Sequence, residues 1–227
     1  GPEDGGWRDK MIKNVVFDMG NVLVAYDENR TCRQFMEEGT EEYDRVKAAV
    51  FGSQEWVLLD MGVISEEEGL RRMKNRLKTD RERELAEKCF RHWHEFCMWT
   101  IPGAAEVIRE LKGRGYGIYL CSNASVRLLT CYPQVIPAVD CFDGILFSAE
   151  EKLIKPQREL YQRFFERFGL RAEECFFVDD QPVNIEGAAA CGMQGCCHEK
   201  AEDASTLRRE LEEFLTPPSG QTPRRGE

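Results

Sequence analysis

Short apolar runs alternate with amphipathic stretches over most of the chain, and polar residues follow several of these runs. The first run is Val15–Phe17, and Asp18 comes directly after it. Unbroken runs rich in β-branched and aromatic residues are typical of parallel strands that helices cover on both faces. The other predicted strands are residues 116–121, 143–148 and 175–178, with a last edge strand at 193–198.

Predicted helices separate these strands. They cover residues 104–112, a stretch from Ser125 onward, 156–168, 184–191 and 204–215. Pro156 is expected in the first turn of its helix, where a missing backbone N–H has no effect. Because strands that alternate with helices build βαβ units, this part of the chain predicts a doubly wound α/β domain with a parallel sheet.

The segment between the first strand and residue 100 has helical periodicity and no β-prone run. Its predicted helices are residues 30–38, 41–51, 65–77 and 80–99. Ser65–Glu68 has the form of a capping box, in which serine and glutamate satisfy each other's free backbone N–H groups. A helical insert directly after the first strand would lie over the carboxyl edge of the sheet, as a lid does.

These patterns divide the chain into a core, a cap and two ends. The predicted core consists of residues 11–27 and 100–215, the predicted helical cap of residues 28–99, and residues 1–10 and 216–227 are expected to be flexible ends. The last segment is polar and rich in Pro and Gly, which is typical of a loose tail.

Composition narrows the possible partners and location. The chain carries 31 basic and 41 acidic residues, a net charge of −10, which argues against a nucleic-acid partner. No apolar run approaches the roughly 20 residues that span a bilayer, so no membrane partner is expected. The first ten residues lack the apolar core of a signal peptide, and we expect a cytoplasmic protein. Its ten scattered cysteines include no C-x-x-C pair and do not suggest a disulfide scaffold.

Polar side chains gather at one edge of the predicted sheet. Asp18, Ser122–Asn123 and Asp179–Asp180 follow three different strands, and right-handed crossovers would place Lys155 on the same side. Open parallel sheets bind ligands at this carboxyl edge. Each residue alone is equally compatible with a helix cap, an exposed turn or a solvated lysine. Their joint position favours a functional site.

Two carboxylates, hydroxyl or amide donors and a lysine are the groups that hydrolysis of a phosphate ester needs. A carboxylate can attack phosphorus to give an aspartyl-phosphate, which water then removes. Mg²⁺ held by carboxylate and carbonyl oxygens neutralises the phosphate. The lysine and the amide or hydroxyl donors bind the remaining phosphoryl oxygens. The sequence thus predicts Mg²⁺-dependent hydrolysis of a small phosphorylated metabolite.

Four ordered motifs carry a resemblance to a known family. They are Phe17–Leu23, Leu120–Asn123, Lys155–Pro156, and Phe176–Asp180 with Asn184–Ala188. From about residue 13 to 215 the chain resembles the haloacid dehalogenase-like hydrolase superfamily. It is most similar to the bacterial sugar-phosphate phosphatase branch that includes alpha-D-glucose 1-phosphate phosphatase. The resemblance implies a Rossmann-like core with a helical cap inserted after the first strand, and sugar phosphates as substrates.

The resemblance also implies roles for individual residues. Asp18 would be the nucleophile and a Mg²⁺ ligand, and Gly20 would give its backbone carbonyl to the metal. Asp180 would bind the metal directly, whereas Asp179 would act through water or as a neighbour of the direct ligands. The groups that would hold the phosphate are Ser122, Asn123, the Ala124 backbone and Lys155.

One position departs from the pattern of the superfamily. Most of its phosphatases carry a second aspartate two residues after the nucleophile, where it protonates the leaving group, and this chain has Gly20 there. Loss of such an acid can reduce the rate about 10²–10⁴-fold for a poor leaving group. The sugar-phosphate branch resembles this chain in having glycine at that position. Asp27, Glu55 and Asp60 of the predicted cap are candidates to replace the acid.

Two other functions stay open. A metal-independent 2-haloacid dehalogenase also lacks the second acid, and a non-catalytic sensor of phosphorylated ligands would retain the pocket without turnover. Two adjacent acids at 179 and 180 favour the phosphatase, and Gly20 disfavours a phosphomutase. Trp56, Trp93 and Trp99 could stack on a sugar, although their helical spacing is also typical of core residues. The sequence leaves the oligomeric state open.

Overall fold

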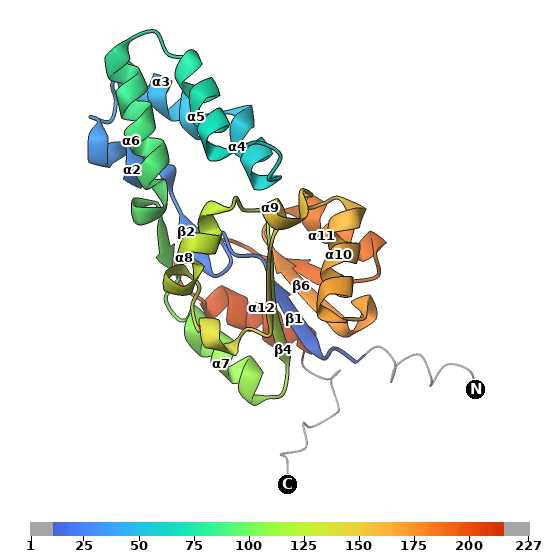
Figure 1. Ribbon diagram of the computed structural model, residues 1–227. Helices are drawn as coiled ribbons and strands as arrows, with labels where there is room; N and C mark the ends of the chain where they lie inside the picture. The colour runs from blue at the N-terminus through green and yellow to red at the C-terminus, as the bar shows by residue number, and fades with distance from the viewer. Residues whose placement is uncertain (1–10, 216–227) are drawn as a thin grey trace, which may run out of the picture.

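A computed structural model describes residues 11–215, and a five-stranded parallel sheet lies at the centre of its larger part (Figure 1). The strand order is β5–β4–β1–β6–β7, with parallel pairing throughout. The strands are β1 (Asn14–Phe17), β4 (Gly117–Ser122), β5 (Gly144–Phe147), β6 (Cys175–Asp179) and β7 (Gln194–Cys197). The predicted α/β fold with a parallel sheet is therefore confirmed, including the edge position of the last strand.

The alternation of side chains along β1 explains its unbroken apolar run. Val15 and Phe17 lie in one buried cluster, whereas Val16 lies in another on the opposite face of the sheet. Ile108 belongs to the first cluster and Phe164 to the second, so helices cover both faces. The flanking helices are α7 (Ala104–Gly113), α8 (Arg127–Val135), α9 (Ser148–Glu151), α10 (Arg158–Phe168), α11 (Pro182–Ala190) and α12 (Ser205–Leu215).

Five of the six helices between β1 and β4 form a layer at one end of the molecule (Figure 1). They are α2 (Glu28–Phe35), α3 (Glu41–Val50), α4 (Gln54–Asp60), α5 (Glu66–Asn75) and α6 (Asp80–Phe96). Their apolar side chains form a third buried cluster, which includes Val46, Met73 and Phe90. We call residues 28–96 the helical insert.

The structure corrects the prediction at both ends of this insert. Residues 98–100 do not extend α6, because they form β3 (Met98–Thr100), which pairs antiparallel with β2 (Val24–Tyr26). These two short strands connect the insert to the sheet domain. A three-residue strand has too few positions to show a period, and its partner lies far away in the sequence. The seven-residue helix α4 was also not predicted, and Ser53 at its start makes no side-chain capping bond.

Helix starts agree with the local sequence signals in part. Ser65 Oγ accepts the Glu68 N–H at 3.0 Å, as the capping box requires. The Glu68 carboxylate binds Arg71 and Arg72 instead of completing the box. Pro156 does not lie in the first turn of α10, because the chain makes a turn in which the Gln157 N–H donates to the Ile154 carbonyl at 2.8 Å.

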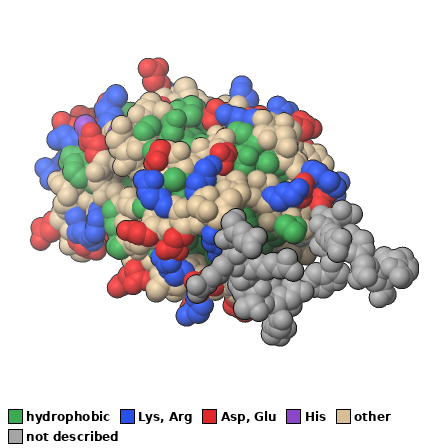
Figure 2. Space-filling view, turned by 90° about the horizontal axis from the view of Figure 1, so that it is seen from below, with side chains coloured by type: hydrophobic (Ala, Val, Ile, Leu, Met, Phe, Trp, Pro, Cys, Tyr) green, Lys and Arg blue, Asp and Glu red, His purple; other side chains and the backbone are tan. Residues whose placement is uncertain are grey.

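The surface carries charges of both signs. On the face shown in Figure 2, basic and acidic side chains are interspersed rather than gathered into a patch of one sign. Among residues 11–215 no helix is both long and apolar enough to cross a membrane. The two predicted flexible ends, residues 1–10 and 216–227, lie outside the described residues.

Candidate active site

The site lies where three neighbouring strands end. β1 lies between β4 and β6, and Phe17 is in register with Leu120 on one side and Val178 on the other. Asp18, which follows Phe17, donates its backbone N–H to the Val178 carbonyl at 2.9 Å. The next residues of all three strands therefore meet at the carboxyl edge of the sheet. The structure brings together Asp18, Ser122, Asn123, Lys155, Asp179 and Asp180 around one cavity, with Asp179 packed behind its wall.

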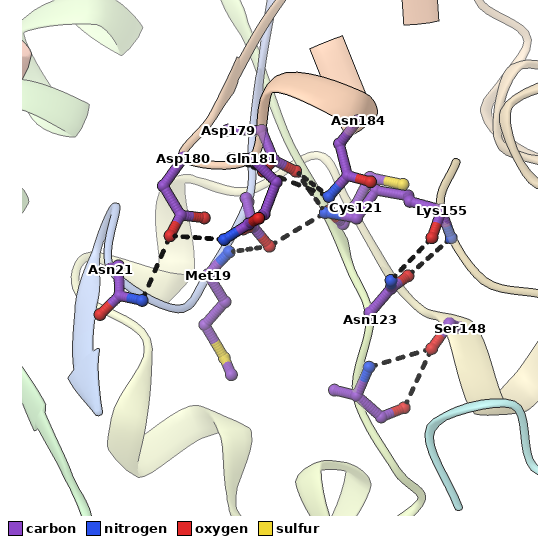
Figure 3. Close-up of polar contacts among 12 residues, drawn as sticks. Met19, Asn21, Cys121, Asn123, Ser148, Lys155, Asp179, Asp180, Gln181 and Asn184 are labelled. Atoms are coloured by element: carbon purple, nitrogen blue, oxygen red, sulfur yellow. Dashed lines mark hydrogen bonds and ion pairs between the residues drawn. The ribbon is translucent and has the colours of Figure 1, made fainter. Parts of the chain in front are cut away.

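Lys155 is the buried cation of this edge. Its Nζ donates to Asp18 Oδ1 at 3.0 Å, to Asp179 Oδ2 at 2.7 Å and to the Cys121 carbonyl at 2.9 Å. The side chain is only 1% exposed, so these three acceptors replace water as the partners of the ammonium group. Figure 3 shows Lys155 reaching toward Asp179 from its loop.

The Asn123 side chain positions Lys155 through the backbone. Its Oδ1 accepts the Lys155 N–H at 2.8 Å, and its Nδ2 donates to the Lys155 carbonyl at 3.1 Å (Figure 3). The Ala124 N–H is likewise engaged, since it donates to Ser148 Oγ at 2.9 Å. Three of the four groups expected to bind phosphate, Asn123, the Ala124 amide and Lys155, thus have protein partners in this structure. Ser122 lines the cavity beside them.

Three carboxylates form the acidic part of the site. Asp18, Asp179 and Asp180 each place one oxygen within 4.8 Å of the others, which is close enough to share one cation. Asp180 Oδ2 accepts from Asn21 Nδ2 at 3.2 Å, and both Asp179 oxygens accept from Asn184 Nδ2. An all-oxygen donor set of this kind fits a hard divalent cation such as Mg²⁺.

The turn after Asp18 has open space at Gly20. A Cβ built on Gly20 would meet no atom within 4 Å, and its φ is not left-handed. Asn21, the next residue, has a left-handed backbone conformation with a φ of 63°. No described residue donates a hydrogen bond to the Gly20 carbonyl, which leaves that oxygen available to a metal ion.

Burial and like charge shift the ionisation of the central pair. Burial, together with Asp179 and Asp180, raises the pKa of Asp18 to about 7, although Lys155 opposes this shift. Burial disfavours the charged form of Lys155, but the carboxylates of Asp18 and Asp179 outweigh it and raise the lysine pKa above its ordinary value. The three carboxylates thus carry more negative charge than Lys155 alone can balance, and a metal ion would supply the second positive charge.

A cavity of about 270 Å³ opens onto these groups, with the helical insert forming its outer wall. Trp56 and Trp93 line it, packed edge to face with ring centroids 5.2 Å apart. Trp99 does not line it and instead packs under the Arg30 guanidinium, 3.6 Å from the ring centroid. Further lining residues from the connecting strands and α8 are Val24, Tyr26, Met98 and Leu128.

The three candidates for the missing acid differ in position. Asp60 lines the cavity. Asp27 caps α2 by accepting the Asn29 N–H at 3.0 Å, and it is not part of the lining. Glu55 is buried in a two-pronged ion pair with Arg76, with contacts of 2.5 and 2.6 Å, and it also lies outside the lining.

Some residues of the site were not assigned a role from the sequence. Asn184 lies in one of the recognised motifs, and its place in the first turn of the helix that follows Asp179 was a usable signal. Asn21 follows Gly20 in the first motif and contacts Asp180. Ser148 had no signal of its own, because its partners Ala124 and Asp60 lie far away in the sequence.

Comparison with known proteins identifies the family. A model of haloacid dehalogenase-like hydrolases matches residues 12–192, so this chain belongs to that family, as its motifs predict. It is 27% identical over 185 residues to a sesquiterpene phosphatase of Aspergillus oryzae, covering 81% of this chain and 88% of the relative. It is 26% identical to a D-ribitol-5-phosphate phosphatase of Bacteroides thetaiotaomicron, covering 90% of this chain and 99% of the relative.

Solved structures show the same fold. A family enzyme of Bacteroides thetaiotaomicron, in complex with magnesium and inorganic phosphate, has a TM-score of 0.66 and 22% identity and covers 86% of this chain and 98% of its own. An L-2-haloacid dehalogenase of Xanthobacter autotrophicus has a TM-score of 0.60 and 21% identity, with coverage of 92% of this chain and 85% of its own. This chain therefore shares its Rossmann-like fold with a family enzyme that binds magnesium and phosphate and with a dehalogenase.

Proposed function

We propose that this protein is a Mg²⁺-dependent phosphatase that hydrolyses small phosphomonoesters through an aspartyl-phosphate on Asp18. The observation that carries the proposal is the convergence of three carboxylates and one buried lysine at the carboxyl edge of the sheet, where Asp18, Asp180 and Lys155 line a single cavity. A cavity of about 270 Å³ suits a small ligand. The phosphatases among the relatives support the same reaction.

Asp18 has one oxygen that is free to react. Its Oδ1 accepts from Lys155 Nζ and from the Met19 N–H at 2.9 Å, whereas Oδ2 receives no hydrogen bond from the described residues. Oδ2 would attack phosphorus, the bond from phosphorus to the ester oxygen would break, and the alcohol would leave. Water would then attack the acyl phosphate, releasing inorganic phosphate and restoring the carboxylate.

Residues at the edge of the sheet would hold the metal and the phosphoryl group. Asp18, Asp180 and the Gly20 carbonyl are the proposed direct Mg²⁺ ligands, and Asp179 would lie behind them with Lys155. When bound, Mg²⁺ would neutralise phosphoryl charge and allow the carboxylate and the anionic substrate to approach each other. Lys155 and Ser122 would contact the phosphoryl group, while Asn123 would act by holding the Lys155 backbone in place. The Ala124 amide would have to leave Ser148 Oγ to contribute.

The alcohol part of the substrate has two candidates. Sugar phosphates follow from the sequence resemblance, and the aromatic faces of Trp56 and Trp93 could stack on a sugar ring. The outer lining favours an apolar alcohol as the second candidate, because Val24, Met98 and Leu128 line it together with these rings. Lys155 is the one cationic side chain among the lining residues, so a second anionic group on the substrate would find no basic partner there.

The helical insert would act as the cap of this enzyme. We assign residues 11–27 and 100–215 to the core and residues 28–99 to the cap, with β2 and β3 as the connection that would flex. The insert forms the outer wall of the cavity, which is the position from which a cap excludes water. A cytoplasmic setting completes the proposal, and the ten free thiols suit a reducing compartment.

One assay with three arms tests the proposal. Phosphate release from p-nitrophenyl phosphate that requires Mg²⁺ and stops with EDTA would support it. Chloride release from 2-chloropropionate in the presence of EDTA would instead identify a dehalogenase. Binding of phosphorylated ligands without turnover, even of p-nitrophenyl phosphate with Mg²⁺, would identify a sensor. A panel of sugar phosphates and alkyl or prenyl phosphates would then separate the two substrate candidates.

A further inference from the structure

The leaving alcohol needs a proton that the turn after Asp18 cannot supply. Breaking the bond between phosphorus and an alkyl oxygen leaves an alkoxide, which is a poor leaving group unless an acid protonates it. Gly20 has no side chain, and the space beside it is open. Lys155 is shared by two carboxylates that favour its charged form, so it does not readily give up a proton. The acid must come from another wall of the cavity.

Asp60 is fixed at that wall by its own backbone. It is the last residue of α4, and its carbonyl accepts from Ser148 Oγ at 2.5 Å. Gly62 packs against the start of α9 so closely that a Cβ there would lie 2.2 Å from the Ala149 carbonyl oxygen. The same Ser148 hydroxyl accepts the Ala124 N–H beside the site. This end of the insert is therefore docked on the edge of the sheet that carries Asp18.

The Asp60 carboxylate is without a partner in the part of the chain that the structure describes. It lines the same cavity as Asp18, and it makes neither a hydrogen bond nor an ion pair with any other residue in the described range 11–215. Of the acidic side chains in that lining, Asp18 and Asp180 belong to the carboxylate cluster, which leaves Asp60 as the third. Asp27 and Glu55 are engaged elsewhere as a helix cap and in an ion pair.

We propose that Asp60 is the general acid of the phosphatase, supplied by the helical insert in place of the missing side chain at Gly20. The inference rests on the proposed function. In the first step Asp60 gives its proton to the ester oxygen as that oxygen leaves phosphorus. In the second step its carboxylate takes a proton from the water that attacks the aspartyl-phosphate, which returns Asp60 to its starting form. Burial raises the pKa of Asp60 to about 7, so both forms are accessible near neutral pH.

The test compares esters whose leaving groups need the acid to different degrees. With Asp60→Asn, kcat/KM for an alkyl phosphate should fall about 10²–10³-fold, whereas p-nitrophenyl phosphate, whose phenolate leaves without a proton, should lose less than about tenfold. The parameter kcat/KM is chosen because it reports the step in which the alcohol leaves. Asp27→Asn is the matched control, since asparagine caps a helix as well as aspartate does and Asp27 lies outside the cavity.

A second variant tests whether the lost group is an acid or only a structural element. Gly20 has room for a side chain, so Gly20→Asp in the Asp60→Asn background should restore at least about tenfold of the alkyl phosphate activity. Circular dichroism and thermal unfolding would establish that each variant is folded.

The possible results distinguish failure of the role of Asp60 from failure of the proposed phosphatase activity. Equal losses for alkyl and aryl esters, or full activity of Asp60→Asn on alkyl phosphates, would overturn the role of Asp60 while leaving the phosphatase in place. Failure of Gly20→Asp to rescue a selective loss would show that Asp60 acts through the shape of the cavity and would also overturn the role. Absence of phosphate release by the unmodified protein from every ester with Mg²⁺ would overturn both.

Discussion

Replacing Lys155 by methionine tests the charge arrangement of the site through stability. The Lys155 ammonium lies 3.0 Å from one Asp18 oxygen and 2.7 Å from one Asp179 oxygen, and all three side chains are at most 12% exposed. At an effective dielectric of ~20, each contact corresponds to an attraction of about 6 kcal/mol before desolvation is subtracted. Removing one partner of a buried pair typically costs about 3–5 kcal/mol, because the remaining charges lose their compensation.

The expected effect is large enough to measure by thermal unfolding. For a protein of 227 residues, each kcal/mol corresponds to roughly 2–4 °C, so Lys155→Met should unfold about 6–20 °C lower in EDTA. Mg²⁺ should raise the unfolding temperature of this variant more than that of the unmodified protein, because a metal ion that binds the native state can neutralise the carboxylates that the lysine no longer compensates. Lys152→Met is the control, since Lys152 is exposed and only three residues away.

Two results would refute this reasoning: a small change in the unfolding temperature, or the same response to Mg²⁺ in both proteins. A Lys155→Met variant that unfolds within about 2 °C of the Lys152→Met control would show that the two carboxylates do not depend on the lysine. An equal response of both proteins to Mg²⁺ would show that the cation does not bind among these acids.

Two further predictions concern the metal and the insert. Asp180→Asn should raise the Mg²⁺ concentration for half-maximal activity at least about tenfold while leaving the unfolding temperature nearly unchanged, and an unaltered Mg²⁺ titration would remove Asp180 from the ligands. Glu55→Gln should lower the free energy of unfolding by about 1–3 kcal/mol at pH 7, whereas Glu41→Gln, whose side chain is 92% exposed, should not. The hydrogen bonds from Arg76 hold the pKa of Glu55 below its ordinary value of 4.5. The Glu55 contribution is therefore fully present above about pH 4.5 and should be lost as pH falls through the lowered pKa, so denaturant titrations of the unmodified protein and Glu55→Gln should converge in acid.

Local patterns were sufficient to predict the sheet and the edge at which the polar residues gather. The run Val15–Phe17 is buried on both faces, which is why its hydrophobicity is unbroken, and the acid that follows it stands out for the same reason. Right-handed crossovers predict Lys155 on the same side of the sheet as Asp18 without any knowledge of side-chain packing, and the structure adds the contact between them. These features depend on short segments and on rules of chain topology.

Features that depend on distant partners could not be predicted in this way. The β2–β3 pair joins segments more than seventy residues apart, and neither strand shows a period. The engagement of Asn123 with the Lys155 backbone and of Ala124 with Ser148 depends on how separate loops pack. Asp60 and Glu55 are both acids on α4, and the structure alone separates them, since one faces the cavity and the other is neutralised by Arg76.

The central claim is that Asp18 takes the phosphoryl group onto its own carboxylate. Rapid quenching of the enzyme during turnover of a ³²P-labelled phosphomonoester, followed by mapping of the labelled peptide, measures this directly. The account predicts Mg²⁺-dependent label on the peptide that contains Asp18, and no label and no turnover for Asp18→Asn. Sustained turnover by Asp18→Asn, or label on a different residue, would contradict it.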